Sequence, residues 1–180
     1  MVAFGRTLVW GQIPTYVYWP PGYNAPLNPA AFSFLQKIVN ARVTFARKYV
    51  VTGLMLPPPV VQSPTFTATY FIGGSGNLSS SKDFPAVQLA AWKAPDGDVG
   101  IVFANTDKKS VQIQLPVNFK RLSLDGKQIY TACLLRASGG VELSPAVGPE
   151  ATYDVQLDPS DVGVLELSAV PRACPSSVPG

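Results

Sequence analysis

The sequence contains no histidine in its 180 residues. This absence excludes catalysis by serine–histidine–aspartate or cysteine–histidine groups, a histidine general base and zinc held through histidine. Charged residues are also scarce, at 14% of the chain, where roughly 25% is usual for a globular protein. Much of the surface must therefore be uncharged, which is typical of strands that are buried on one face.

Long apolar runs are absent too. No run reaches the roughly 18 residues that a membrane-spanning helix needs, and residues 1–6 lack the basic-then-apolar order of a secretory signal peptide. We therefore expect no membrane partner for this chain, and its location in the cell stays unknown.

Acidic side chains are missing from residues 1–82, where every charged residue is Lys or Arg. All 11 carboxylates lie between Asp83 and Glu166. A basic segment that carries aromatic residues can bind nucleic acid. The cations here are scattered along the segment instead of forming a patch, so we expect no nucleic-acid partner.

Cysteine occurs twice, at Cys133 in an apolar run and at Cys174 in a proline-rich terminal segment. The two residues show no CxxC or metal-ligand spacing. They could form one disulfide, but the apolar surroundings favour a buried free thiol at Cys133. We expect no metal site and no cofactor.

Aromatic residues, by contrast, gather near the N-terminus. The segment from Trp10 to Tyr23 also holds three prolines and two glycines, which predicts a loop. Flat rings can stack on sugar faces and amides can bind hydroxyl groups, although the same rings could instead pack a following helix onto the strands. The candidate substrate-binding residues are Trp10, Gln12, Tyr16, Tyr18, Trp19 and Tyr23.

One long amphipathic helix is predicted over residues 30–52. Asn28 is a suitable N-cap, Pro29 fits the first helical position and Gly53 fits the position after the last turn. The expected polar stripe is Ser33, Lys37, Asn40, Thr44 and Lys48, and the expected apolar face is Leu35, Ile38, Val39, Phe45, Ala46 and Tyr49. Arg42 falls on the apolar side, so it either extends past the helix edge to water or has a carboxylate or carbonyl partner.

After the prolines at 57–59 the apolar period changes to two. About eight short strands follow, separated by turn signals, with a glycine- and serine-rich loop expected over residues 73–81. The pattern predicts a mainly β chain: an antiparallel β-sandwich of about eight strands preceded by one long amphipathic helix. Residues 7–10 add a short apolar run that predicts a buried strand.

Three regions follow from this pattern. Residues 1–56 form an extended aromatic-rich segment and the long helix, residues 57–170 form the antiparallel sandwich, and residues 171–180 form a flexible tail.

The acidic residues suggest structural roles. Hydrolysis of a glycosidic bond usually needs two carboxyl groups roughly 5–10 Å apart. Turn chemistry accounts for Asp96, Asp98, Asp125, Asp158 and Asp161. Solvent-facing strand or loop positions are expected for Glu142, Glu150, Asp154 and Glu166. We therefore assign no catalytic residue.

The order of these segments resembles the C-terminal end of a glycoside-hydrolase-type (β/α)8 barrel protein. The likeness spans most of residues 6–168: residues 8–12 resemble a last barrel strand, 28–52 the closing helix, 47–58 a linker, and 85–92, 96–106 and 158–167 strands of a following sandwich. The barrel itself, which needs about 200 residues, is absent from this chain. The resemblance implies a parent glycoside hydrolase whose catalytic carboxylates lie elsewhere.

These observations lead to two hypotheses. The first is a noncatalytic accessory module of a carbohydrate-active, glycoside-hydrolase-like protein, with carbohydrate as a partner at the aromatic loop and a missing barrel domain or a second copy covering the helix. The alternative is a small stand-alone hydrolase that uses sandwich carboxylates such as Asp96, Asp98 or Asp154.

Overall fold

The structure is a computed structural model that describes residues 1–13, 29–71, 79–137 and 139–175. These ranges contain three helices and ten strands. The helices are α1 (Val2–Val9), α2 (Pro29–Val43) and α3 (Arg47–Val50). The strands are β1 (Leu54–Leu56), β2 (Thr65–Phe71), β3 (Ser79–Pro85), β4 (Val87–Lys93), β5 (Val99–Asn105), β6 (Val111–Asn118), β7 (Ile129–Arg136), β8 (Gly139–Val147), β9 (Glu150–Leu157) and β10 (Val162–Ser168).

The strands form one large sheet and two ribbons. The six-stranded sheet has the order β1-β4-β5-β10-β7-β8, and β6 pairs with β9 while β2 pairs with β3. Every one of these pairings is antiparallel. The prediction of a mainly β, antiparallel fold is therefore confirmed.

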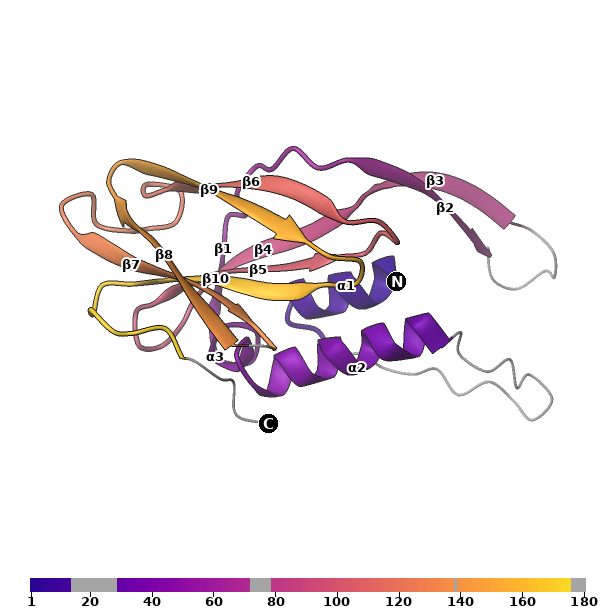
Figure 1. The fold of residues 1–180 in the computed structure, drawn as a ribbon, viewed down its shortest axis with the longest axis horizontal. Coiled ribbons are helices and arrows are strands. Elements are labelled where there is room, and N and C mark those ends of the chain that lie inside the picture. The colour runs from indigo at the N-terminus through magenta and orange to yellow at the C-terminus, as the bar shows by residue number, and fades with distance from the viewer. Residues whose placement is uncertain (14–28, 72–78, 138, 176–180) are drawn as a thin grey trace.

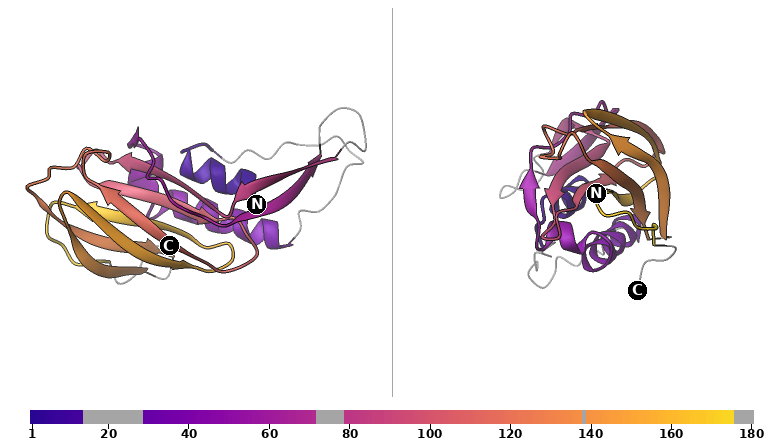
Figure 2. Two further views of the ribbon diagram at one scale, coloured as in Figure 1. Left: turned by 90° about the horizontal axis from the view of Figure 1, so that it is seen from above. Right: turned by 90° about the vertical axis from the view of Figure 1, so that its left-hand side faces the viewer.

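The elements stack in three layers. Figure 1 shows α1 and α2 on one side of the six-stranded sheet and the β6–β9 ribbon on the other, and Figure 2 gives the side and end views. The central strands β5 and β10 are consequently buried on both faces along their whole length. Their sequences are nearly continuous apolar runs for this reason.

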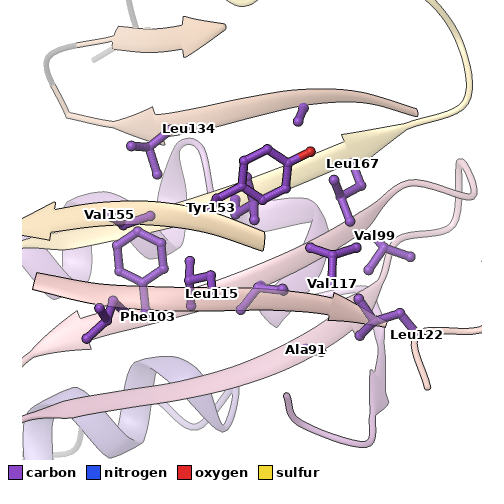
Figure 3. Close-up of a cluster of buried hydrophobic side chains, with 14 of the residues drawn as sticks. Ala91, Val99, Phe103, Leu115, Val117, Leu122, Leu134, Tyr153, Val155 and Leu167 are labelled. Atoms are coloured by element: carbon purple, nitrogen blue, oxygen red, sulfur yellow. The ribbon is translucent and has the colours of Figure 1, made fainter. Parts of the chain in front are cut away.

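The larger core lies between the six-stranded sheet and the β6–β9 ribbon. Figure 3 shows Phe103 and Val99 from the sheet beside Leu115, Val117 and Val155 from the ribbon. Strand β6 alternates buried and exposed residues, as its period of two predicts. Removing these apolar side chains from water is the main stabilising contribution expected from this layer.

The second core lies between the helices and the sheet. Its fully buried side chains include Phe34, Ile38 and Tyr49 from α2 and α3, which belong to one cluster with the sheet residues Ala90, Val102, Ala104 and Val164. The buried stripe of α2 contains Phe34, Ile38 and Ala41. The expected face was wrong at Val39, which is 44% exposed.

The long helix predicted over residues 30–52 is divided in two. The backbone N–H of Ala46 donates to the carbonyl of Ala41, five residues back, and the Thr44 hydroxyl donates to the carbonyl of Asn40. The first bond interrupts the regular α-helical pattern between α2 and α3, and the second is of a kind that often bends helices. The break changes which residues face the sheet, so a single continuous stripe predicted the buried face incorrectly.

The predicted strand at residues 7–10 is wrong, because residues up to Val9 belong to α1. Gly5, Leu8 and Val9 are its buried residues, with the three- and four-residue spacing of a helix. A short apolar run does not distinguish a strand from a buried helix. The resemblance of residues 8–12 to a last barrel strand is therefore not reproduced by the structure.

Strand β10 pairs with β5 at a position, Gly163 opposite Phe103, where only glycine fits without a clash. A Cβ atom built on Gly163 would lie 2.6 Å from Cζ of Phe103, whose ring fills the larger core. We expect Gly163→Ala to lower the free energy of unfolding by about 1–3 kcal/mol, because the ring must move within a packed core. Urea unfolding followed by tryptophan fluorescence measures this change.

The matched control is Gly126→Ala, since a Cβ at Gly126 meets no atom within 4 Å. Equal urea midpoints for the two variants would contradict the proposed packing at Gly163.

Candidate functional site

The structure describes two of the six candidate binding residues. Trp10 follows α1 and is 48% exposed, with the Arg6 guanidinium 5.4 Å from the centre of its ring. Gln12 is exposed as well. A guanidinium over an indole face stabilises the ring position. Tyr16, Tyr18, Trp19 and Tyr23 lie outside the described residues, so the structure does not bring the six together.

The start of the aromatic segment is held by Arg42. Its Nη1 donates to the carbonyl oxygens of Gly11 at 3.0 Å and of Gln12 at 3.3 Å. The carbonyl-partner alternative for this residue is therefore confirmed, although the carbonyls come from the N-terminal segment. The indole N–H of Trp92 donates to the carbonyl of Val9 at 2.9 Å on the sheet side. Residues 9–12 are thus fixed by both α2 and β4.

A second feature, which the sequence did not reveal, is a set of charged side chains beneath α3. We call it the ion cluster. It consists of Lys48, Tyr49, Asp96, Asp98, Glu166 and Arg172. Its residues come from α3, the turn between β4 and β5, strand β10 and the chain after β10.

Two carboxylates form the buried centre of the ion cluster. Asp98 is 5% exposed and Glu166 is 6% exposed. Both cations contact both of them: the Lys48 ammonium lies 3.0 Å from Glu166 Oε2 and also bonds Asp98, and Nη2 of Arg172 lies 2.6 Å from Glu166 Oε1 and also bonds Asp98. The Tyr49 hydroxyl donates to Glu166 Oε2 at 2.6 Å. Each buried charge is therefore compensated, as burial in a protein interior requires.

The expected solvent-facing position of Glu166 is wrong. The side chain lies on the face of β10 that is turned towards the helices, and Tyr49 from α3 reaches it directly. The sequence did contain a signal for this burial, because Glu166 is a single acid within the apolar run of β10. A buried acid needs partners that compensate its charge. The turn role expected for Asp96 is confirmed, since its Oδ1 accepts the backbone N–H of Asp98 at 3.1 Å.

The charged groups of the ion cluster stabilise one another's ionised forms. Burial by itself would raise the pKa of Asp98, but hydrogen bonding and charge from Lys48, with the charge of Arg172, outweigh burial and lower that pKa. Burial likewise opposes the charge of Lys48, but its bonds to Asp98 and Glu166 raise its pKa. Burial, followed by the charge of Glu166, raises the pKa of the Tyr49 hydroxyl far above its usual value. At neutral pH Asp98 is therefore a carboxylate and Tyr49 a neutral donor.

This arrangement is unsuited to acid–base chemistry on a glycan. A general acid in a glycosidase needs a carboxyl group with a raised pKa, whereas that of Asp98 is lowered. Burial raises the pKa of Asp161, but its Oδ2 lies 3.3 Å from Nε of Arg136 and its Oδ1 accepts the N–H of Val162. Asp154 is exposed and accepts from Gln114. Turn and strand contacts thus account for these acids.

The chain after β10 is fastened to the sheet. Cys174 forms a disulfide with Cys133 of β7, so the expectation of a free thiol at Cys133 is wrong. Their Cα atoms are 5.8 Å apart, a usual separation for bridged cysteines. The N–H of Gly140 also donates to the carbonyl of Pro175 at 2.7 Å. We call residues 169–175 the C-terminal strap; it includes five residues of the predicted flexible tail, Arg172 among them.

The described residues contain neither a metal-binding cluster nor a membrane-spanning helix. In the part of the chain that the structure describes, no three His, Cys, Asp or Glu residues are placed to hold a metal ion. No helix in the described ranges is both long enough and apolar enough to cross a bilayer.

Lys48 is the cation common to all three carboxylates of the ion cluster. We expect Lys48→Met to lower the free energy of unfolding by about 3–5 kcal/mol, because Asp98 and Glu166 would stay buried with a single cation between them. Urea unfolding measures the effect, and Lys37→Met is the control because Lys37 is exposed with one carbonyl contact. A loss below that of the control would show that the cluster does not stabilise the fold.

The lowered pKa of Asp98 gives stability a defined pH dependence. The unfolded chain binds a proton near pH 3.8, while the folded chain keeps this carboxylate ionised to lower pH. The contribution of Asp98 to the free energy of unfolding is therefore complete above pH 3.8 and is lost as the pH falls through the pKa of the folded chain. Urea midpoints measured from about pH 5 to about pH 2 should fall less steeply in Asp98→Asn than in the wild type. Equal slopes would contradict the assignment.

The C-terminal strap should open when its disulfide is reduced. A dithiol cleaves the Cys133–Cys174 bond, the two cysteines gain two electrons and two protons, and the dithiol becomes a disulfide. Residues 169–175 then keep only noncovalent contacts, so trypsin cleavage after Arg172 should accelerate about tenfold or more. Cleavage after the exposed Lys109 is the internal control. Mass spectrometry follows both cuts, and an unchanged rate at Arg172 would contradict the role of the disulfide.

Comparison with known proteins shows a distant structural similarity and no sequence match. No protein-family model matches the sequence, and no curated protein matches it either. Among solved structures, this chain is similar to a Bacillus halodurans protein described as a putative alpha-N-acetylgalactosaminidase, with 11% sequence identity and a TM-score of 0.44. The similarity covers 95% of this chain and 30% of that chain, so the present chain spans under a third of its length.

Proposed function

We propose that this chain is a noncatalytic accessory module of a carbohydrate-active, glycoside-hydrolase-like protein. The observation that carries the noncatalytic part is the ion cluster. Asp98 and Glu166 are the closely spaced carboxylates that a hydrolase would use, yet both are committed to Lys48 and Arg172. Carboxylates paired in this way stabilise a fold instead of exchanging protons with a substrate.

Contact with a glycan is proposed at the aromatic segment. The indole of Trp10 presents about half of its surface to solvent and is supported from behind by Arg6. A rigid exposed ring is a suitable platform for the C–H face of a sugar. Gln12, Tyr16, Tyr18, Trp19 and Tyr23 complete the proposed binding surface.

A neighbouring barrel domain is the proposed partner of helix α2. The outer side of α2 carries an uncharged stripe with exposed Phe32, Val39 and Val43 and a half-buried Leu35. Apolar residues spaced by three and four along a helix usually pack against another element. Neither the stripe nor the rest of the first 82 residues contains an acidic residue. Charge complementarity therefore favours a partner domain with acidic residues around the contact over a second copy that is equally basic. Light scattering that shows a dimer would favour the second copy.

The binding proposal is tested by isothermal titration with neutral trisaccharides: cellotriose, xylotriose, maltotriose and triacetylchitotriose. We expect binding of at least one, and Trp10→Ala should weaken it about three- to tenfold through loss of the stacking surface. Phe32→Ala is the control, because Phe32 is an equally exposed ring on α2. No heat with any trisaccharide would contradict glycan binding.

The noncatalytic proposal needs a separate assay. The purified chain should release no product from the same trisaccharides. Turnover that disappears in Asp98→Asn or Asp154→Asn would instead establish the stand-alone hydrolase.

A further inference from the structure

The outward face of the β6–β9 ribbon carries a groove that neither Trp10 nor Gln12 lines. The ribbon covers the opposite side of the six-stranded sheet from α1 (Figure 1). Two adjoining open hollows, of about 370 and 530 Å³, lie between this face and the linker that follows β1. They share Val60, Pro116 and Thr152 in their walls, so together they form one continuous groove within the size range of small-molecule sites.

The groove is lined by amides and hydroxyls. Gln112 and Gln114 of β6 and Thr152 of β9 point outward because the alternate residues of both strands fill the core. Gln62 of the linker faces them across the larger hollow. In the described part of the chain, the amides of Gln62 and Gln112 and the hydroxyl of Thr152 have no hydrogen-bond partner. An amide both donates and accepts, so these groups can bind a hydroxyl in either sense.

Charge in the groove disfavours anions. Asp154 and Glu150 contribute carboxylates, which accept from Gln114 at 3.2 Å and from Asn118 at 2.8 Å. The cation among the lining residues is Arg121, whose Nε is committed to the carbonyl of Pro58 at 2.7 Å. An acidic ligand would meet more negative than positive charge here. Hydroxyl groups, by contrast, can donate to the two carboxylates.

Apolar surface is present at the middle of the groove. Val60 is 73% exposed although it follows three prolines that fix the path of the linker. Pro116 is half-buried on the facing strand, and both line both hollows. An exposed valine beside proline gives the C–H face of a sugar ring an apolar contact between the amides.

We propose that this groove is a neutral-glycan subsite, separate from Trp10 and on the other side of the sheet. The inference rests on the proposed carbohydrate-binding function, and it assigns part of that binding to amide hydrogen bonds instead of aromatic stacking. The ligand class is an uncharged oligosaccharide of two or three sugars, held by Gln62, Gln112, Gln114 and Thr152.

The test uses the four neutral trisaccharides named above, with trigalacturonate as the acidic comparison. We expect the double variant Gln112→Ala/Gln114→Ala to weaken the affinity of the groove for the best neutral trisaccharide about tenfold and to leave the affinity at Trp10 unchanged, since the groove loses two hydrogen-bonding amides. The control is Gln36→Ala/Asn40→Ala, which removes two exposed amides from α2. Both pairs lie on the surface, so circular dichroism and urea midpoints should match the wild type.

The outcomes separate this inference from the function on which it rests. Binding that survives in Gln112→Ala/Gln114→Ala but is lost in Trp10→Ala overturns the groove and keeps the proposed function. Absence of binding by every neutral trisaccharide overturns both. Tighter binding of trigalacturonate than of all neutral sugars overturns the groove, because its charge argument would then be wrong.

Discussion

The pairing of Glu166 with Lys48, Tyr49 and Arg172 joins parts of the fold that are far apart in sequence. Glu166 lies in the centre of β10, two partners come from α3 and the third from the C-terminal strap. A carboxylate in the middle of a doubly covered strand is costly unless its charge is compensated. Helix α3 can lie over the sheet near Glu166 because it brings two of these partners to the acid. The short helix, the strap and the sheet are therefore mutually dependent.

The same constraint explains the break in the helical segment. A straight helix over residues 30–52 would continue the stripe of α2, but Tyr49 must lie over the sheet above Gly100, where a Cβ would be 2.6 Å from the ring. The turn at residues 44–46 allows α3 to bring Tyr49 and Lys48 to β10 and to the β4–β5 turn. The break between α2 and α3 therefore places Tyr49 over Gly100 and at the same time brings the partners that compensate the charge of Glu166.

The sequence predicted what depends on local periodicity. The alternation in β6 and the turn at Asp96 follow from neighbouring residues. Strands β5 and β10 are buried along their whole length, where the period of two predicted half-buried strands. Strand β8 contains two glycines and one proline, which are typical of a loop, so its sequence did not indicate a strand. The ion cluster and the disulfide join residues from distant elements. Their pairing depends on tertiary contacts that no local pattern contains, although a lone acid in β10 indicated that partners were needed.

The proposed function also depends on how the acidic side chains are paired. Asp98, Glu166 and Asp161 are paired with cations, whereas Trp10, Gln112 and Thr152 present aromatic or uncharged polar groups at the surface. These observations support the proposal that the chain recognises neutral, hydroxyl-rich ligands. The most direct measurement of this pairing is a carbon-13 NMR titration of the Asp98 carboxyl group. The account predicts ionisation that persists below pH 3.8, the ordinary value. A midpoint raised towards neutrality would contradict it, because such a carboxyl could serve as a general acid.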